Sequence, residues 1–260
     1  MSAKSASDAV PAVDRAVEIL QAMARARQPL MLSELSQLTA TSRSTTFNTL
    51  ATLHKHGLVS KDERHKTYSL GIGLFELGIA YIEQVSLIPA FVENAQRLVD
   101  HCGETVKLAV RQERDVVYLS AVEGPHSVRL VALVGTRRPA HLTAVGKVLL
   151  SELDDGELDD MYADYTFYPH TPNAINNLTE LKSELTEIAL VGHGYDREES
   201  SLGVNCVAAA VRDYSGQVIA AMSVGVPNDR LTRARMDELT GLIRSYALDL
   251  SLTLGWRGPG

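Results

Sequence analysis

Apolar and polar positions alternate with helical spacing over the first quarter of the chain. A first amphipathic helix is predicted from Val13 to Arg27, because apolar residues recur at the helical spacing of Val13, Ala16, Val17, Leu20, Met23 and Ala24. Pro29 ends this helix. A short second helix follows with Ser33 as its expected N-cap, and Ser42 is placed to cap a third helix that runs to His56.

The third predicted helix has a polar face that contains no acidic side chain. Its outward positions are Thr45, Asn48, Thr49 and Thr52, and its inward positions are Phe47, Leu50, Ala51 and Leu53. An ordinary surface helix carries Glu and Lys on its wet face. Hydroxyl and amide groups instead hydrogen-bond phosphates and base edges without repelling them. This face therefore indicates contact with DNA.

Two short strands, Leu58–Val59 and Tyr68–Leu70, enclose a charged turn directly after this helix. Helix, short helix, polar-faced helix and basic hairpin together predict a winged helix-turn-helix. A small interaction domain of the same shape is the alternative. The residues expected to contact DNA are Ser42, Arg43, Ser44, Thr45, Thr46, Asn48 and Thr49 of the helix and Lys61, Arg64 and Lys66 of the hairpin.

The remainder of the chain predicts an α+β domain. A helix from Ile72 to Val85, with Tyr81 and Ile82 among its side chains, is apolar nearly all round, so a neighbouring chain or domain must cover it. Further helices are expected at 91–101, 144–151, 155–162, 179–191 and 233–254. Strands are expected at 105–111, 116–121, 128–133, 206–212 and 218–224, the last two joined by a turn at 213–216, which together give a largely antiparallel sheet.

Charge is distributed unevenly along the chain. Residues 1–75 hold nine Lys and Arg against six Asp and Glu, whereas the other 185 residues hold 16 basic and 26 acidic side chains. The overall charge of −7 therefore hides a basic first module, which is expected to bind an anion, and a larger acidic one.

Several classes of protein are excluded by what the sequence lacks. No apolar run approaches the roughly 18 residues of a membrane span, and the N-terminus has no secretory core, so a cytoplasmic protein without a membrane partner is expected. Only Cys102 and Cys206 are present, which is too few for a disulfide framework or a zinc site. Nucleotide-binding and hydrolase motifs are missing as well, and no cofactor, metal or catalytic residue is predicted.

Three segments of the second domain have the composition of a ligand site. Residues 141–147 form a strand-to-helix junction whose free N–H groups suit an anionic or carbonyl ligand, although an ordinary capped helix explains them equally well. Acidic residues cluster between glycines at 192–206, and Ser223 lies among apolar neighbours near a strand end. Cys206 with nearby His and Asp admits a nucleophile, but its apolar strand favours a buried, inert thiol.

These motifs occur in the same order in a known family. The chain resembles the IclR family of bacterial transcriptional regulators over about residues 10–255. In the first domain the resemblance rests on residues 15–20, Ser44-Thr45, residues 50–53, Gly57-Leu58-Val59 and residues 68–71. In the second domain it rests on residues 142–147, residues 194–206 and the turn around Gly216.

The resemblance implies an N-terminal winged helix-turn-helix and a C-terminal GAF-like α/β effector domain, joined by a linker helix. On this basis residues 1–12 are a flexible arm, 13–71 the DNA-binding domain, 72–88 the linker helix and 89–260 the effector domain. It also implies homodimers, or homotetramers built from them. In the third helix, Asn48 stands where an arginine is common in the family, which is expected to change the bases that are recognised, because Asn pairs with adenine and Arg with guanine.

The family's effector pocket maps onto six positions of this chain. The resemblance places the effector against Ala144, Val145, Asp196, Cys206, Ser223 and Gly225. Gly225 stands where the family has a second serine, so one polar anchor is lost and space is gained. We therefore expect an effector larger than a two-carbon acid.

The sequence thus predicts a ligand-responsive DNA-binding regulator, acting as a repressor of a catabolic operon, with a small organic acid or amide as effector. Its expected partners are a pseudo-palindromic duplex, the effector and further copies of itself. The alternative is an enzyme acting on a small metabolite, with an N-terminal helical interaction module. The salt dependence of duplex binding distinguishes the two, because only a DNA reader loses affinity steeply as salt rises.

Overall fold

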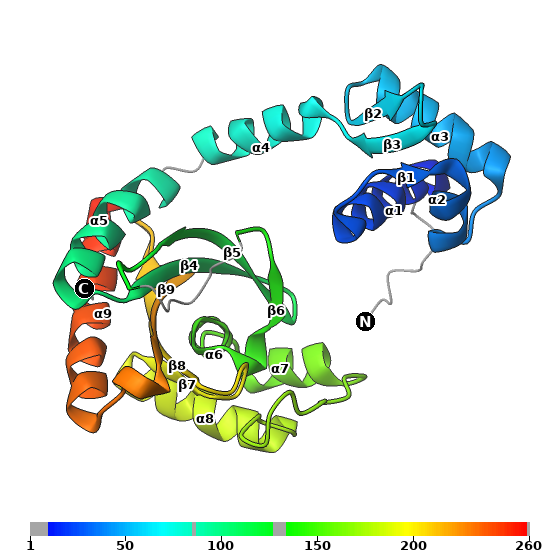
Figure 1. The fold of residues 1–260 in the computed structure, drawn as a ribbon. Helices are drawn as coiled ribbons and strands as arrows, with labels where there is room; N and C mark the ends of the chain where they lie inside the picture. Colours follow the sequence, from blue (N-terminus) through cyan, green and yellow to red (C-terminus); the bar gives the residue numbers. More distant parts are fainter. Residues whose placement is uncertain (1–9, 85–86, 127–133, 259–260) are drawn as a thin grey trace. The chain divides into compact units, whose positions relative to one another are not determined.

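The chain folds into two compact units. The computed structural model describes residues 10–84, 87–126 and 134–258. Its backbone divides into Met1–Val85 and Ser86–Gly260 (Figure 1). The division falls inside the segment 72–88 that the sequence assigns to the linker.

The first unit combines helices with a small antiparallel sheet. Its elements are α1 (Pro11–Ala26), β1 (Leu30–Met31), α2 (Leu32–Leu38), α3 (Arg43–Lys55), β2 (Val59–Asp62), β3 (Thr67–Leu70) and α4 (Ile72–Gln84). The strands are ordered β1-β3-β2, and β2 with β3 forms the hairpin. Ile19 of α1, Leu35 of α2, Leu50 of α3 and Tyr68 of β3 meet in its core. This is a winged helix-turn-helix, as the sequence predicts.

Local details of the first unit differ from the expected ones. α1 begins at Pro11 instead of Val13, because a proline at the first helical position loses no hydrogen bond. Residues 11 and 12 therefore do not belong to an arm, and residues 1–9 lie outside the described part of the chain. The cap of α2 is Met31, whose N–H donates to Glu34 Oε2 at 2.6 Å, so Ser33 lies inside the helix. The strand β1 was not predicted, because two residues are too few to show alternation.

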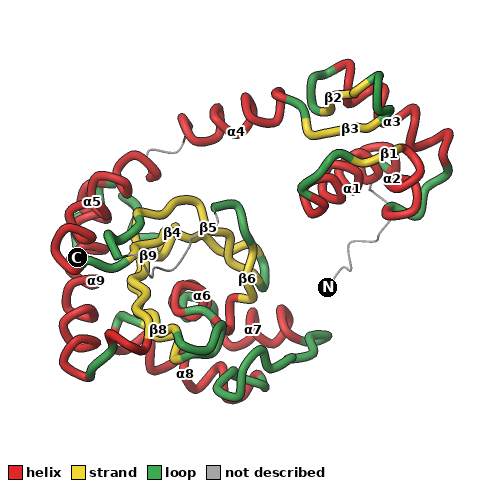
Figure 2. The backbone as a smooth tube through the Cα atoms, viewed as in Figure 1, coloured by secondary structure: helices red, strands yellow, loops and turns green. Residues whose placement is uncertain are grey.

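The second unit is an α/β domain built on one curled sheet. Its helices are α5 (Leu87–Cys102), η1 (Ala140–Leu142), α6 (Ala144–Leu150), α7 (Asp155–Tyr162), α8 (Leu178–Val191), η2 (Asn228–Arg230) and α9 (Arg233–Thr253). Its strands are β4 (Thr105–Gln112), β5 (Asp115–Val122), β6 (Arg137–Pro139), β7 (Gly194–Arg197), β8 (Val204–Arg212) and β9 (Val218–Pro227). The tube view separates the strands from the helices that cover them (Figure 2).

The sheet of the second unit is antiparallel throughout, in the order β6-β5-β4-β9-β8-β7. The helix α6 lies inside its concave face, whereas α5 and α9 pack together on the other face (Figures 1 and 2). The α+β fold class predicted from the sequence is confirmed. The curl matters for function because it encloses the start of α6 between strands.

Every residue of α6 is buried. Gly146 allows α6 to pack closely against Ala140, because a Cβ atom at residue 146 would lie 2.2 Å from the carbonyl oxygen of Ala140. Thr143 caps the helix, its side chain accepting from the N–H of Gly146 at 3.0 Å. The sequence Thr-Ala-Val-Gly-Lys at residues 143–147 thus has a structural explanation in the capping and close packing of α6.

Strand boundaries in the second unit also differ from the expected ones. The strand expected at 128–133 lies outside the described residues, and β6 follows it at Arg137–Pro139. The strand β7 was not predicted, because its four residues are mostly polar and lie in a glycine-bounded segment. β8 begins at Val204, before Cys206, and β9 extends to Pro227. None of the described helices is long and apolar enough to cross a membrane.

Candidate functional site

The outward face of α3 presents polar groups. Ser42 accepts from the N–H of Thr45 at 3.2 Å and thereby fixes the start of the helix. The hydroxyl of Thr49 donates to the carbonyl of Thr45 at 3.0 Å, which leaves its oxygen as an outward acceptor. Asn48 is exposed, and no described residue hydrogen-bonds its amide. A side-chain amide held outward in this way can reach a base edge.

Thr46 and Phe47 are placed differently from the sequence-based expectation. Thr46 is fully buried and donates to the carbonyl of Ser42 at 3.0 Å, so it cannot belong to an outward DNA-contacting set. Phe47 is 49% exposed although it was predicted to face inward. The inward stripe is Thr46, Leu50 and Leu53, because a threonine that hydrogen-bonds its own helix packs like an apolar residue. Arg43 and Ser44 are exposed.

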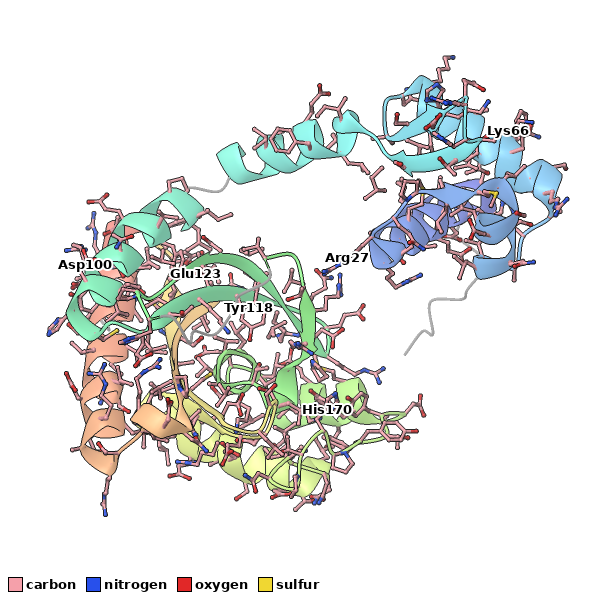
Figure 3. The ribbon with its side chains drawn as sticks, in the orientation of Figure 1. Arg27, Lys66, Asp100, Tyr118, Glu123 and His170 are labelled. Atoms are coloured by element: carbon pink, nitrogen blue, oxygen red, sulfur yellow. The ribbon has the colours of Figure 1, made fainter. Side chains whose placement is uncertain are left out.

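The β2–β3 hairpin carries the basic side chains of the wing. Asp62 accepts from the N–H groups of Arg64 and His65 at 2.8 and 3.1 Å, which shapes the turn. The hydrogen bond from the His65 ring lowers the pKa of Asp62. Lys61 donates to Glu63 at 2.8 Å, whereas Arg64 and Lys66 are exposed at the turn (Figure 3). Arg64 and Lys66 are therefore better placed than Lys61 to meet a phosphate.

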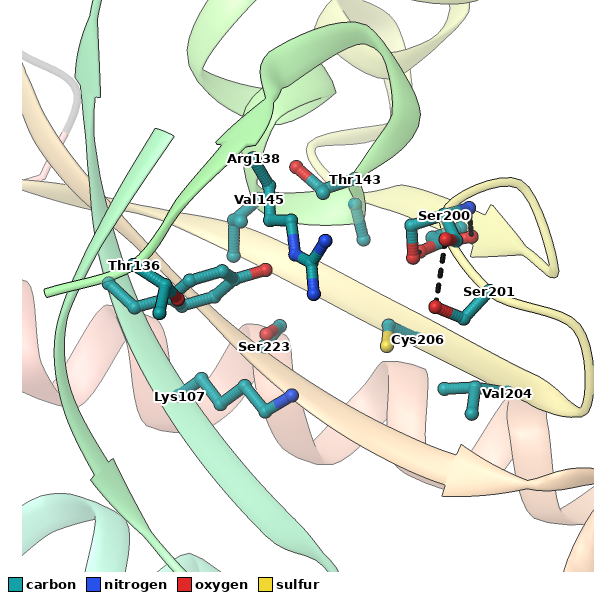
Figure 4. Close-up of a pocket in the computed structure, with 13 residues that line it drawn as sticks. Lys107, Thr136, Arg138, Thr143, Val145, Ser200, Ser201, Val204, Cys206 and Ser223 are labelled. Carbon is teal, nitrogen blue, oxygen red and sulfur yellow. Dashed lines mark hydrogen bonds between the residues drawn. The ribbon is translucent and has the colours of Figure 1, made fainter. Parts of the chain in front are cut away.

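The second unit contains a cavity of about 180 Å³ beside the start of α6. Five of the six residues expected to bind an effector line it: Ala144, Val145, Asp196, Cys206 and Ser223. Gly225 is not among the lining residues. The described residues that complete the lining are Lys107, Tyr118, Thr136, Arg138, Thr143, Ser200, Ser201 and Val204 (Figure 4).

The strand register brings these distant positions to one face of the sheet. Asp196 pairs with Cys206, and Cys206 pairs with Gly225 on the next strand. Ser223 pairs with Lys107 of β4. Directly opposed residues share a face, so this row of side chains points to the concave side. Gly225 shares that face without a side chain, which leaves room instead of an anchor.

Asp196 is held rigidly at one side of the cavity. One carboxylate oxygen accepts from the N–H groups of Glu199 and Ser200 at 2.8 and 3.2 Å, and the other accepts from the Ser200 hydroxyl at 2.5 Å. Burial raises the pKa of Asp196, while these hydrogen bonds act in the opposite direction. The carboxylate is thus a preorganised acceptor for a donor group on a ligand.

A buried lysine helps to hold the turn that carries Asp196. Lys147 of α6 is fully buried, and its ammonium group donates to Glu199 Oε1 at 2.7 Å and to Glu184 Oε1 at 2.6 Å. Glu199 also accepts from the N–H of Arg197 at 3.1 Å. Lys147 therefore ties α6 and α8 to the turn that carries Asp196.

Cys206 contributes a neutral thiol to the cavity. Burial and the neighbouring Asp196 carboxylate raise the pKa of this thiol to about 12. A protonated thiol is a poor nucleophile. The expectation of an inert cysteine therefore agrees with the geometry better than covalent catalysis does, and no three His, Cys, Asp or Glu side chains of the described residues are grouped as metal ligands.

Two family models match successive parts of the chain. The IclR helix-turn-helix domain matches residues 12–63, and the bacterial transcriptional regulator IclR C-terminal domain matches residues 79–252. The chain belongs to the IclR family of bacterial transcriptional regulators. Membership implies DNA binding by the first unit and binding of a small-molecule effector by the second. The protein is a ligand-responsive transcriptional regulator and not an enzyme.

Curated members of the IclR family resemble the chain over most of its length. The transcriptional regulator KdgR of Dickeya chrysanthemi is 31% identical over 249 residues, covering 96% of this chain and 81% of that protein. The transcriptional repressor AllR of Escherichia coli K12 is 32% identical over 244 residues, covering 94% and 90%. The similarity thus extends through both units.

Solved IclR-family structures share the fold. The Thermotoga maritima IclR matches with a TM-score of 0.72 and 27% identity, covering 94% of this chain and 98% of that one. An IclR homologue from Microbacterium hydrocarbonoxydans, solved with 4-hydroxybenzoate, matches with a TM-score of 0.80 and 19% identity over 94% and 98% of the two chains. At that identity the second match shows the fold alone.

Part of the cavity lining was not predicted from the sequence. Ser200 and Thr143 lie in segments that have the composition of a ligand site, and their hydroxyl groups were available as a signal. Lys107 was also visible, as a charged residue in the otherwise apolar run Thr105–Val110. Tyr118 and Arg138 come from strands that carry no motif, so only the register of the sheet reveals them.

Proposed function

We propose that this IclR-family protein is a repressor of a catabolic operon whose binding to a pseudo-palindromic operator is controlled by a small organic acid or amide. The observation that carries the proposal is the convergence of Asp196, Cys206 and Ser223 on one cavity, in a chain whose first unit exposes the polar face of α3. The name of AllR, a transcriptional repressor, supports the direction of control.

In this proposal the effector lies between the start of α6 and the 196–200 turn. The N–H groups of Ala144 and Val145 and the hydroxyl of Ser223 offer donors, and Asp196 offers an acceptor. A compact acid or amide with a donor group at its other end satisfies both sides. Its binding shifts the equilibrium between DNA-binding states by a coupling of about 1–3 kcal/mol.

DNA recognition is assigned to α3 and the wing. The base-reading set is Arg43, Ser44, Thr45, Asn48 and Thr49, with Ser42 as the cap; Lys61, Arg64 and Lys66 contact phosphates. Replacing Asn48 by alanine is expected to weaken operator binding by about 1–3 kcal/mol and to relax preference at one base position. Affinities for an operator selected from a random duplex pool, and for its single-base variants, measure both effects.

Lys66→Ala is the matched comparison for the Asn48 prediction. A lost phosphate contact should weaken binding about equally for every duplex and lower the slope of log affinity against log salt by about one. An Asn48→Ala protein with unchanged base preference would show that α3 does not lie in the major groove.

Assembly through the first unit and the linker helix is expected from exposed apolar side chains. Val13 and Val17 of α1 are 58% and 46% exposed, and Ile72, Phe75 and Leu77 of α4 are 62–68% exposed. The side chains of Tyr81 and Ile82 lie outside the described residues. Apolar groups gathered on two helices in this way favour burial by a second copy.

Phe75→Glu is therefore expected to shift the protein from dimer or tetramer toward monomer. Sedimentation at micromolar concentration measures this shift, with Leu190→Glu on α8 as the control, because Leu190 is 83% exposed but lies in the second unit. A wild-type protein that sediments only as a monomer would refute the assembly, since one chain cannot set the spacing of two half-sites.

A further inference from the structure

Two cationic side chains enter the effector cavity from different strands. Lys107 extends from β4 and Arg138 from β6, and in the close-up the ends of both side chains point into the hollow (Figure 4). The Lys107 ammonium lies 5.6 Å from the centre of the Tyr118 ring. Neither position belongs to the set that the family resemblance supplied.

Neither cation is neutralised by the described residues. No described carboxylate forms an ion pair with Lys107 or Arg138, whereas Lys147 is held by Glu199 and Arg230 by Glu104. Asp196, the acidic residue among the described lining, has its oxygens engaged by Glu199 and Ser200. The two positive charges therefore remain available to a ligand.

Both cations and the Asp196 carboxylate act on the same hollow. Burial is the main cause that raises the pKa of Cys206 and of Tyr118, and the Asp196 carboxylate adds to the rise, while the charge of Lys107 at Cys206 and that of Arg138 at Tyr118 oppose it. Two cations and one carboxylate, Asp196, line the described part of this hollow, so its net charge is positive. Such a site attracts an anion.

We propose that Lys107 and Arg138 bind the carboxylate of the effector and thereby select an acid over the corresponding neutral amide. This inference rests on the proposed function and makes the effector class more specific. Full charges hold a carboxylate more strongly than neutral N–H groups do. The carboxylate accordingly lies on the side of Lys107 and Arg138, and the rest of the ligand extends toward Ser200 and Asp196.

Matched acids and amides test this assignment on the full chain. Lactate and 4-hydroxybenzoate are compared with lactamide and 4-hydroxybenzamide by thermal unfolding and by titration. We expect stabilisation by acids and little by their amides. Lys107→Met and Arg138→Gln should each weaken binding of a stabilising acid about 10-fold or more, while Lys107→Arg keeps the preference for the acid because it keeps the charge.

Arg137→Gln is the matched control. Arg137 precedes Arg138 on β6, and both are exposed, but only Arg138 lines the cavity, because neighbouring residues of a strand point to opposite faces. Its removal changes the net charge equally but should leave acid binding as in the wild type. This comparison separates a local contact from the general charge of the unit.

Two results would overturn the inference: amides that bind as well as their acids, or Lys107→Met and Arg138→Gln proteins that bind an acid as Arg137→Gln does. The proposed function fails in a different way. It fails if a compound that stabilises the chain through the cavity leaves operator affinity unchanged. A neutral compound that binds the cavity and weakens operator binding would refute the carboxylate assignment and leave the proposed function intact.

Discussion

Replacing Lys147 by methionine is expected to lower the free energy of unfolding of the second unit by about 3–5 kcal/mol. The ammonium group is fully buried and is bound by Glu184 and Glu199, so its loss leaves two carboxylates facing each other without a counter-charge. Urea unfolding of the full chain measures the change. Lys182→Met is the control, because Lys182 pairs with Asp159 and Asp155 at the surface and its loss should be barely detectable.

The pH dependence of the same variant checks the cause. Burial raises the pKa of Glu199, and Lys147 opposes that rise, so the pKa rises further in Lys147→Met. A native-state pKa above the unfolded value means that the native state gains protons first as the pH falls. The stability deficit relative to wild type should therefore shrink toward acidic pH. A deficit that stays constant would point to lost packing instead.

Replacing Asp196 by alanine is expected to abolish the response to the effector. Asp196 is 2% exposed, lines the cavity and is fixed by three hydrogen bonds, so its loss removes both the acceptor and the order of the 196–200 turn. The measurement is operator affinity with and without a compound that stabilises the wild type. The expected ratio falls from about 5–150 in the wild type to about one.

A second variant keeps the Asp196 prediction testable if alanine disturbs the fold. Asp196→Asn retains an oxygen for the two backbone N–H groups while removing the charge, and it should lose most of the response. Asp160→Ala, on the exposed side of α7, is the control for removing an acidic residue. An Asp196→Asn protein that responds to the compound at wild-type concentration would place the effector site elsewhere.

Local patterns predicted the elements of the first unit better than they predicted which side chains face outward. The helices and the hairpin strands follow from spacing and turn residues, because these contacts are close in sequence. The buried side chains of α1 do not: they are Ile19, Ala22 and Met23, and only Met23 belongs to the predicted apolar stripe. Thr46 was misassigned because helical spacing alone does not show that a threonine hydroxyl bonds to its own helix at Ser42. Phe47 was misassigned because Thr46 takes the inward position next to it. The buried stripe of α3 then runs beside Phe47, and its aromatic side chain stays half exposed.

The cavity could not be predicted without knowledge of the fold. Asp196, Cys206 and Ser223 could be named because they lie in motifs, but their meeting depends on the β7-β8-β9 register, which is a long-range property. Lys107 and Arg138 were missed because a single cation in a strand, even one that interrupts an apolar run as Lys107 does, does not show what it faces until its cross-strand neighbours are known. The role of Lys147 likewise appears only when α6 is placed against Glu184 and Glu199.

Operator affinity measured with and without a saturating cavity ligand tests the central claim most directly. The operator is first selected from a random duplex pool by the full chain, and its binding must fall by orders of magnitude between about 50 and about 200 mM salt. At one fixed salt concentration, we predict that an acid which stabilises the second unit changes operator affinity by about 5–150-fold. Identical affinity in the presence and absence of that acid would contradict control of α3 by the cavity beside α6.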